Sequence, residues 1–357
     1  MHPSAMVGCQ NENSGLSAYD LDIESFRHVN LVRSGNPGQG PERMTLIVKR
    51  LWLALLLSST SVSAFAQEFP LKRVPNLTYV VDYEASWSPD GHQIVLISSR
   101  HGGMKVHILD ASSDGNGSYM RQITSGPNED DSPAWSPDGR QIAFVSVHGD
   151  ISDIFAMNVD GSNVRQVTRG LGQNIHPMWS PDGSRILFNT THFGEAGLSD
   201  DKASAEKRVI GEKRDDSIDL ATIRPEGSDL RRITHGGGFT YASFSPDAKS
   251  ILHRRQQGEV SQVFVMNSDG SGDHNLSGSS TLDGWPSWSP TGDRIVFSRH
   301  VQNGFQIFVM NRDGTGVRQL TDAAGEFVNP RWSPDGSKIL CGRRLGGISL
   351  VVIPAPR

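Results

Sequence analysis

The chain has 357 residues, and 34 Lys and Arg stand against 39 Asp and Glu, which gives a net charge of −5 at neutral pH. This near-neutral balance offers no electrostatic case for nucleic-acid binding. The length beyond the leader is sufficient for one large domain.

The first 66 residues contain no copy of the repeat that fills the rest of the chain. A short basic segment from Met44, an apolar run at 51–57 and the small residues of Ala64-Phe65-Ala66 predict a signal peptide over 44–66, cleaved before Gln67. The apolar run is shorter than the roughly 20 residues that a membrane span needs. We therefore expect a periplasmic mature chain without a stable membrane span.

Residues 1–43 are polar and show no periodicity, so we expect a non-native or disordered leader with Met44 as the true initiator. The alternative is a disordered extension ahead of an uncleaved anchor. Cleavage would leave Cys341 as the one thiol of the mature chain, since Cys9 lies in the leader, and no internal disulfide could then form.

Residues 67–357 are organised by six near copies of a hexapeptide that ends in Trp-Ser-Pro-Asp-Gly. Three of the five intervals between the copies are 44 residues long. A period of this length, built from short strands, is typical of a four-stranded propeller blade. The aromatic residues of the six copies are Trp87, Trp135, Trp179, Phe244, Trp288 and Trp332.

Each copy predicts four strands and three hairpins. Ser-Pro-Asp-Gly forms a tight turn because Pro fixes φ at the second position and Gly closes the turn. Alternating runs then begin at an Ile seven residues after the aromatic and again at segments such as 154–158, and they indicate two strands. An Asp-Gly turn leads to a short fourth strand, as at 164–168. We predict an all-β, six-bladed propeller of four-stranded antiparallel blades over 67–357.

The last copy has three strands before Pro354-Ala355-Pro356, so it lacks a fourth. Before the first copy, Leu77-Thr78 matches the Leu320-Thr321 ending of a fourth strand. An open stack of blades would expose two sheet edges. We therefore predict that the N-terminal segment completes the last blade as its outer strand.

One long insertion, at 193–216 in the third unit, separates the second and third predicted strands. Its centre, 199–208, is highly charged and combines a helix-capping start with good helix formers. Two interpretations are open, a lid or partner-contact loop and a solvated excursion.

The six Trp/Phe-Ser-Pro-Asp-Gly units, with their Asn-x-Asp-Gly and Arg-x-Leu-Thr elements, resemble the repeats of the TolB-type six-bladed propeller over residues 72–353. The chain departs from TolB because no room for its small α/β domain exists between Gln67 and the first blade. The resemblance implies a cell-envelope interaction module without a cofactor, whose partner could be a peptidoglycan-associated lipoprotein.

Similar propellers accompany prolyl-oligopeptidase-type hydrolases, but this sequence contains no Gly-x-Ser-x-Gly nucleophile motif. A seven-bladed relative is a metal-dependent oligogalacturonide lyase. The alternative function is therefore an enzyme or binder that acts on acidic oligosaccharides at the same channel mouth.

The candidate site lies on the face where irregular loops gather. The connections between blades and between second and third strands share one face of a propeller, the variable face; the repeated turns share the other, the tight-turn face. Irregular loops on a rigid scaffold are where binding usually occurs. Three positions before each aromatic, we expect these residues at the channel mouth: Glu84, Ser132, His176, Tyr241, Trp285 and Asn329. Two positions further out we expect Asp82, Asp130 with its neighbour Asp131, Asn174, Phe239, Asp283 and Phe327.

Units four to six also carry Arg255, Arg299 and Arg343 at the end of the second strand, a cationic half of the rim. Three guanidinium groups could bind carboxylates or an acidic partner. The alternative is that each forms a structural bridge with an acid of a neighbouring blade, such as Asp283 or Glu326.

A lyase-like metal site would need converging imidazoles, and His148 and His192 share a register, with His101 and His176 nearby. No short-range ligand motif supports such a site, so we predict no metal, no cofactor and no catalytic residues. His253 and Cys341 occupy core positions and are expected to be buried. The sequence predicts an exported interaction module rather than an enzyme.

Overall fold

A computed structural model describes residues 67–68, 81–112, 120–169, 172–193, 218–257, 260–345 and 347–356. The predicted leader, signal peptide, closing strand at 77–78 and insertion from residue 194 onward lie outside these ranges. Every regular element within them is a β-strand. In this part of the chain no helix is long and apolar enough to cross a membrane.

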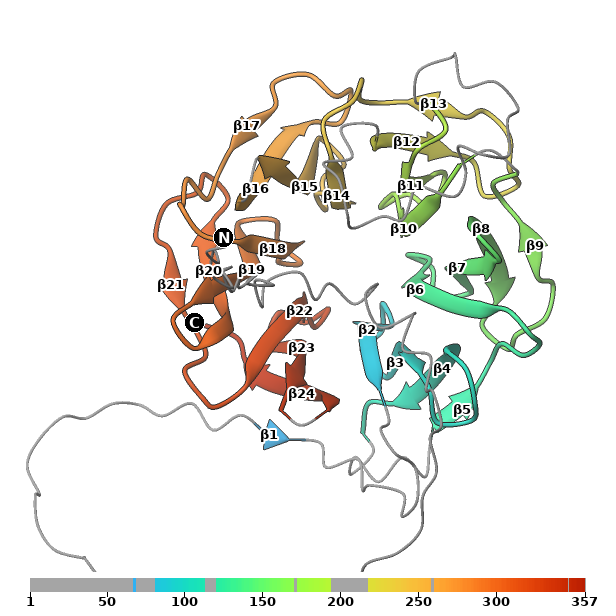
Figure 1. Ribbon diagram of the computed structural model, residues 1–357, viewed down its shortest axis with the longest axis horizontal. Helices are drawn as coiled ribbons and strands as arrows, with labels where there is room; N and C mark the ends of the chain where they lie inside the picture. Colours follow the sequence, from blue (N-terminus) through green and yellow to red (C-terminus); the bar gives the residue numbers. More distant parts are fainter. Residues whose placement is uncertain are drawn as a thin grey trace, which may run out of the picture. The chain divides into compact units, whose positions relative to one another are not determined.

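The strands form six antiparallel four-stranded sheets, the blades of a six-bladed propeller (Figure 1). Blade one contains β2 (Asp82–Trp87), β3 (Gln93–Ser98), β4 (Lys105–Asp110) and β5 (Met120–Gln122). Blade two contains β6 (Glu129–Trp135), β7 (Gln141–His148), β8 (Ile151–Asn158) and β9 (Arg165–Gln166). Blade three contains β10 (Asn174–Trp179), β11 (Ile186–Thr190), β12 (Asp219–Ile223) and β13 (Arg231–Arg232).

Blade four contains β14 (Phe239–Phe244), β15 (Ser250–Gln257), β16 (Val260–Asn267) and β17 (His274–Asn275). Blade five contains β18 (Asp283–Trp288), β19 (Arg294–Val301), β20 (Gly304–Asn311) and β21 (Arg318–Gln319). Blade six contains β22 (Glu326–Trp332), β23 (Lys338–Arg344), β24 (Ile348–Pro354) and, beside β24, β1 (Gln67–Glu68). The predicted fold class and strand count per blade are confirmed.

The hydrophobic core lies between neighbouring blades. One cluster joins Ala143 and Ile154 of blade two to Phe188 of blade three, and Trp179 packs against it. The indole Nε1 of Trp179 also donates a hydrogen bond to the carbonyl of Ala134, at 3.2 Å. Corresponding clusters connect the later blades and include or contact Phe244, Trp288 and Trp332. The repeated aromatic is thus a contact between blades, which explains its regular spacing.

The ring closes through the same kind of packing. Leu340, Leu350 and Val352 of blade six share a buried cluster with Ile94 and Leu96 of blade one. The pairing of β1 with Val351 and Val352 adds a strand at the outer edge of blade six. The predicted closing strand was placed ten residues further along, outside the described ranges, and remains a prediction.

The Ser-Pro-Asp-Gly turns share one hydrogen-bond pattern. In blade two, Ser136 Oγ donates to Asp138 Oδ1 at 2.6 Å and accepts from the backbone NH of Gln141 at 2.9 Å. Blade five has Thr291 in place of the aspartate, and Asp293 accepts the serine hydroxyl bond instead, at 2.8 Å. The turn chemistry therefore survives where the sequence motif departs from its consensus.

One turn position allows a paired stability prediction. Gly139 has φ of +70°, and Ala248 holds the equivalent left-handed position in blade four with φ of 58°. A Cβ at Gly139 would meet only Pro89 Cδ, at an ordinary 3.8 Å. We expect Gly139→Ala to destabilise the protein by about 1 kcal/mol through backbone strain alone. Ala248→Gly should stabilise it by about 0.5 kcal/mol, because glycine's larger unfolded-state entropy offsets part of the relief. Urea unfolding measures both, and equal signs for the two changes would contradict the strain argument.

Candidate functional site at the central channel

The inner strand of every blade contains a β-bulge with a left-handed residue at the same place. In all six blades, the register between inner and second strands shifts just before the repeat aromatic. Inside each shift lies a non-glycine residue with φ between 49 and 54°. These residues, here called the bulge ring, are Glu84, Ser132, His176, Tyr241, Trp285 and Asn329.

A left-handed conformation costs an L-residue about 1–2 kcal/mol, a cost that glycine avoids. All six blades nevertheless place a side chain there. Bulges re-aim side chains, and backbone strain of this kind gathers at functional sites. The bulge ring is therefore the centre of the candidate site, and its members are the residues expected at the channel from their distance to the aromatic.

Because each inner strand runs from the variable face to the tight-turn face, the bulge ring divides the channel into two halves. On the variable-face side, aromatic rings from blades three to five form a continuous row. Ring centroids are 4.1 Å apart for His176 and Tyr241, and 5.7 Å apart for Tyr241 and Trp285. Phe305 lies 5.3 Å from Trp285 and 5.2 Å from His300. We call these five residues the aromatic arc.

The guanidinium of Arg254, on β15, lies over this arc. Its Cζ is 6.0 Å from the ring centroid of Tyr241 and 5.9 Å from that of Trp285, distances at which a cation is attracted to the ring face. Its guanidinium donates a long hydrogen bond to Gln256 Oε1, at 3.4 Å. Neither Arg254 nor Phe305 was expected at the site from the sequence.

Blades one and two, outside the aromatic arc, carry carboxyl groups at the bulge ring. Burial raises the pKa of Glu84 well above its usual value, and the neighbouring Asp131 raises it further. Hydrogen bonding to Ser132 and the positive charge of Arg331 oppose this rise in pKa. Asp131 also accepts the backbone NH of Ser132, at 2.7 Å. Glu84 and Asp131 come from adjacent blades, and their proximity shifts Glu84 toward its neutral form.

Below the bulge ring, toward the tight-turn face, the channel encloses a cavity of about 220 Å³. Five of the six bulge-ring residues line it, as does Pro89 of the first tight turn. A second ring, formed by the residues just before each aromatic, completes the wall: Ser86, Ala134, Met178, Ser243, Ser287 and Arg331. We expected binding on the variable face alone, whereas this cavity lies on the other side of the bulge ring.

The outer positions expected at the mouth are buried instead. Asp82 contacts Arg100 at 2.5 Å, Asp130 lies 3.7 Å from Lys105, and desolvation raises the pKa of Asp130. Asn174 Nδ2 donates to Asp153 at 3.1 Å. Phe239 and Phe327 are 5% and 1% exposed. The reason is the bulge, since a left-handed residue breaks the two-residue alternation that would place both sets on one side.

The three arginines of the predicted cationic rim have partners inside their own blades. Arg299 donates to both oxygens of fully buried Asp283, at 2.8 and 2.9 Å. Arg255 forms an ion pair with Asp273 at 3.0 Å. Arg343 donates to the carbonyl of Ala324 and lies over Phe327. Arg299 and Arg255 therefore form structural ion pairs, as the alternative to a cationic rim predicted. The acids they contact belong to their own blades and not to neighbouring blades. Glu326 pairs with Arg344, at 3.6 Å.

The histidines considered for a metal site have separate neighbours. His101 stacks on His107, with Nδ1 and Nε2 3.0 Å apart, while His148 lies beside Phe155 and His192 beside Phe193. Across the described ranges, no group of three or more His, Cys, Asp or Glu side chains is arranged to hold a metal ion. His253 and Cys341 are buried as expected, at 0% and 1% exposure.

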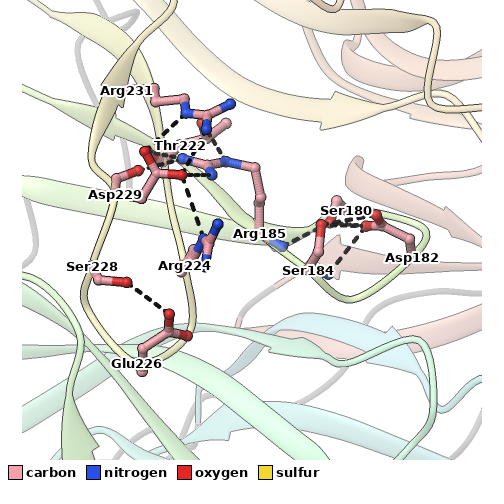
Figure 2. A network of polar contacts seen from close by, with 10 residues as sticks. All are labelled: Ser180, Asp182, Ser184, Arg185, Thr222, Arg224, Glu226, Ser228, Asp229 and Arg231. Atoms are coloured by element: carbon pink, nitrogen blue, oxygen red, sulfur yellow. Dashed lines mark hydrogen bonds and ion pairs between the residues drawn. The ribbon is translucent and has the colours of Figure 1, made fainter.

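On the tight-turn face, blade three departs from the regular pattern. Arg224 and Glu226 occupy the turn where blades two, four and five have Asn and Asp. Asp229 receives hydrogen bonds from Arg231 and Arg185, which lower the pKa of its carboxyl to about 2. Figure 2 shows Arg185, Arg224 and Arg231 around Asp229, with Ser180, Asp182 and Ser184 of the neighbouring turn to one side. Arg224 and Arg231 remain exposed on the face opposite the aromatic arc. They are therefore suitable control positions for substitutions of arginines at the site.

The repeats and the topology agree with a known family. The model of the TolB beta propeller domain matches residues 71–217 and 204–353. The chain belongs to the TolB beta propeller domain family, and the expected TolB-type resemblance is confirmed.

Several solved structures share the fold. TolB from Acinetobacter baumannii aligns with a TM-score of 0.58 and 21% identity, over 71% of this chain and 57% of that one, so the chain spans little more than half of its length. A putative TolB from Agrobacterium tumefaciens gives 0.57 and 23%, over 80% and 93%. An oligogalacturonate lyase in complex with manganese gives 0.56 and 13%, over 83% and 95%. A search of curated proteins found no significant match.

Proposed function

We propose that this protein is an exported protein-interaction module of the cell envelope, and that its partner binds the variable face at the channel mouth. The observation that carries the proposal is the aromatic arc with Arg254 above it. Trp, Tyr and Arg are the residue types that dominate binding energy at protein interfaces. Here Tyr241 and Arg254 of blade four meet Trp285 of blade five at one point of a rigid ring.

The chemistry of this mouth favours a protein partner with an apolar anchor. Tyr241, Arg254, His300 and Phe305 are partly exposed, whereas Trp285 is 5% exposed and forms the floor. Aromatic surfaces of this kind give large contact area at low conformational cost. The packing of Arg254 on two rings leaves its charge available to an acidic group of the partner.

Two further parts of the proposal rest on the sequence and on the family. The predicted signal peptide at 44–66 supports export to the periplasm. The TolB-type resemblance of the repeats, which implies a peptidoglycan-associated lipoprotein as partner, makes this lipoprotein the first one to test.

The test compares capture of that lipoprotein by the purified protein and by two charge-reversal variants. Arg254→Glu, at the aromatic arc, should weaken binding at least tenfold, because it removes the cation from the rings and places a carboxylate over them. Arg224→Glu, on the tight-turn face, is the matched control and should leave the dissociation constant within about twofold. Circular dichroism and thermal melting confirm that both variants fold.

Equal loss with both variants would show that the variable face is not the binding surface, and no loss with Arg254→Glu would exclude the arc. The acidic-sugar alternative makes a different prediction for the same preparation. A stabilising thermal shift with an oligouronate, dependent on added divalent metal, would favour that enzyme class over an interaction module.

A further inference from the structure

The cavity below the bulge ring has a chemistry that the variable-face proposal does not use. Its volume of about 220 Å³ is below the roughly 300–1,000 Å³ of pockets for drug-sized ligands, so any occupant is small. Its wall combines apolar surface from Trp87, Trp135 and Met178 with polar groups of the second ring and the bulge ring. Such a mixed wall suits a molecule with one apolar body and one polar end.

Arg331 gives the cavity its charge. It is the one charged residue of the second ring, whose other members are Ser, Ala and Met. Burial lowers the pKa of its guanidinium, and the negative potentials of Glu84 and Tyr241 oppose this shift. Among the described residues, Arg331 Nη1 donates one hydrogen bond, to the carbonyl of Pro330 at 3.2 Å. A guanidinium carries five donors, so most of this group's hydrogen-bonding capacity remains for another acceptor.

Glu84 does not neutralise that charge fully. Its burial and the adjacent Asp131 both raise its pKa, which shifts Glu84 toward the neutral carboxylic acid beside the guanidinium. This shift reduces the repulsion that the carboxyl group would exert on an anion. The cavity therefore presents a cation on the side shared by blades one and six.

Three polar atoms of the wall point to a ligand independently of these charges. Ser86 Oγ, Ser243 Oγ and Asn329 Oδ1 are buried and have no hydrogen-bond partner within the described part of the protein. Asn329 is 7% exposed, and all three residues line the cavity. Buried polar atoms normally have partners, and here the cavity is the place where a partner would lie.

We propose that this cavity binds a carboxylate carried on a small apolar body, with the carboxylate on the Arg331 guanidinium and the apolar part against Trp87, Trp135 and Met178. Arginine binds carboxylates through two parallel hydrogen bonds, which fixes the orientation of the ligand. The serine hydroxyls and the Asn329 carbonyl complete the polar contacts. The ligand is either a free organic acid or the C-terminus of a peptide, since both present the same group.

The direct test is calorimetric titration of the purified protein with phenylacetate and with its neutral isostere phenylacetamide. Indole fluorescence gives a second readout, because Trp87 and Trp135 form the wall. We expect saturable binding of phenylacetate and at least tenfold weaker binding of the amide. The peptide Gly-Gly-Phe is titrated in the same way, with a free and with an amidated C-terminus. This second titration tests whether the carboxylate comes from the end of a peptide chain rather than from a free acid.

Phenylacetate binding supports a free acid as ligand, and binding of the free-acid peptide alone supports a chain end. If neither acid binds, or if the amides bind as tightly as the acids, the proposal is overturned. Arg331→Met keeps the length of the side chain and removes its charge, so it should weaken binding at least tenfold. Arg224→Met, outside the cavity, is the matched control. Arg254→Glu should leave this binding unchanged, which separates the cavity from the variable-face proposal.

Discussion

Replacement of Asp283 by alanine is expected to destabilise the propeller by about 3–5 kcal/mol, the range for breaking a buried ion pair from one side. Asp283 is fully buried, at 0% exposure, and accepts two hydrogen bonds from Arg299 and one from Ser279 Oγ at 2.8 Å. Without the carboxylate, a guanidinium that is 17% exposed loses its counter-charge. Urea unfolding followed by tryptophan fluorescence measures the change.

Two comparisons identify the cause of the loss. In the double variant Asp283→Ala with Arg299→Met, much of the stability should return, because replacement of both partners of a buried pair is often close to neutral. Glu326→Ala removes a half-exposed pair with Arg344 at 3.6 Å and should cost less than about 1 kcal/mol. A double variant less stable than Asp283→Ala alone would show that an unpaired charge is not the origin.

This ion pair also changes how the arginines of blades four to six are interpreted. Arg299 lies over Phe297 and Phe308, with its Cζ 5.2 and 5.4 Å from their ring centroids, and both of its carboxylate contacts are internal. Reversal of its charge would unfold the blade before it tested partner binding. Arg254, one position before Arg255 in sequence, is the cation that lies over the aromatic arc.

The fold could be predicted from the sequence because its determinants are local and repeated. Trp179 and its equivalents recur at one place in each blade since each fills the same gap against its neighbour. The turn after them is specified within four residues by Ser, Pro, Asp and Gly. Even Thr291, which breaks the motif, leaves the turn intact, because Asp293 takes over the bond. The spacing predicts the blades, and the missing fourth strand of the last copy predicts that the ring is closed.

The site could be predicted only in part, because a bulge is not visible in a hydrophobic pattern. Counting back from the aromatic gave all six bulge-ring residues, including Glu84 and His176. Simple alternation then placed Asp283 beside them, although the left-handed residue reverses the side on which it lies. Comparison of the six copies would have shown Arg331 as the one charge among Ser, Ala and Met. Phe305 has no such signal, since contact with Trp285 depends on how two blades pack.

The stability of the fold is expected to fall steeply as the pH drops from about 4 toward 2, because many turn carboxylates have lowered pKa values. The largest cause in most of them is a hydrogen bond from a serine or threonine hydroxyl, followed by backbone NH groups, as in Asp138. The pKa reaches about 2 in Asp229, Asp247 and Asp335. The pKa is also lowered in Asp90, Asp110, Asp160, Asp182, Glu226, Asp269, Asp293 and Asp313.

The sign of the effect follows from linkage. A carboxyl group with a lower pKa in the folded than in the unfolded state stabilises the fold above its unfolded pKa, and this contribution is lost as the pH falls through the folded value. Glu84 and Asp130 act in the opposite direction, since their raised pKa values give a contribution that is lost as the pH rises. The turn groups outnumber these two, so the net slope on acidification is a loss.

Melting temperature measured from pH 7 to pH 2 tests this expectation, with little change above pH 5 and a steep fall below pH 4. Asp335→Asn should reduce the steepness of the fall, because it removes one titrating group whose hydroxyl and backbone donors come from Ser333 and Ser337. Asp322→Asn is the matched control, since Asp322 is an exposed carboxylate outside the repeated turns and should leave the slope unchanged. A melting temperature that stays constant down to pH 2.5 would show that these turn bonds contribute nothing through charge. The repeated turn would then stabilise the propeller by backbone geometry alone, and Gly139→Ala would affect stability more than any turn aspartate.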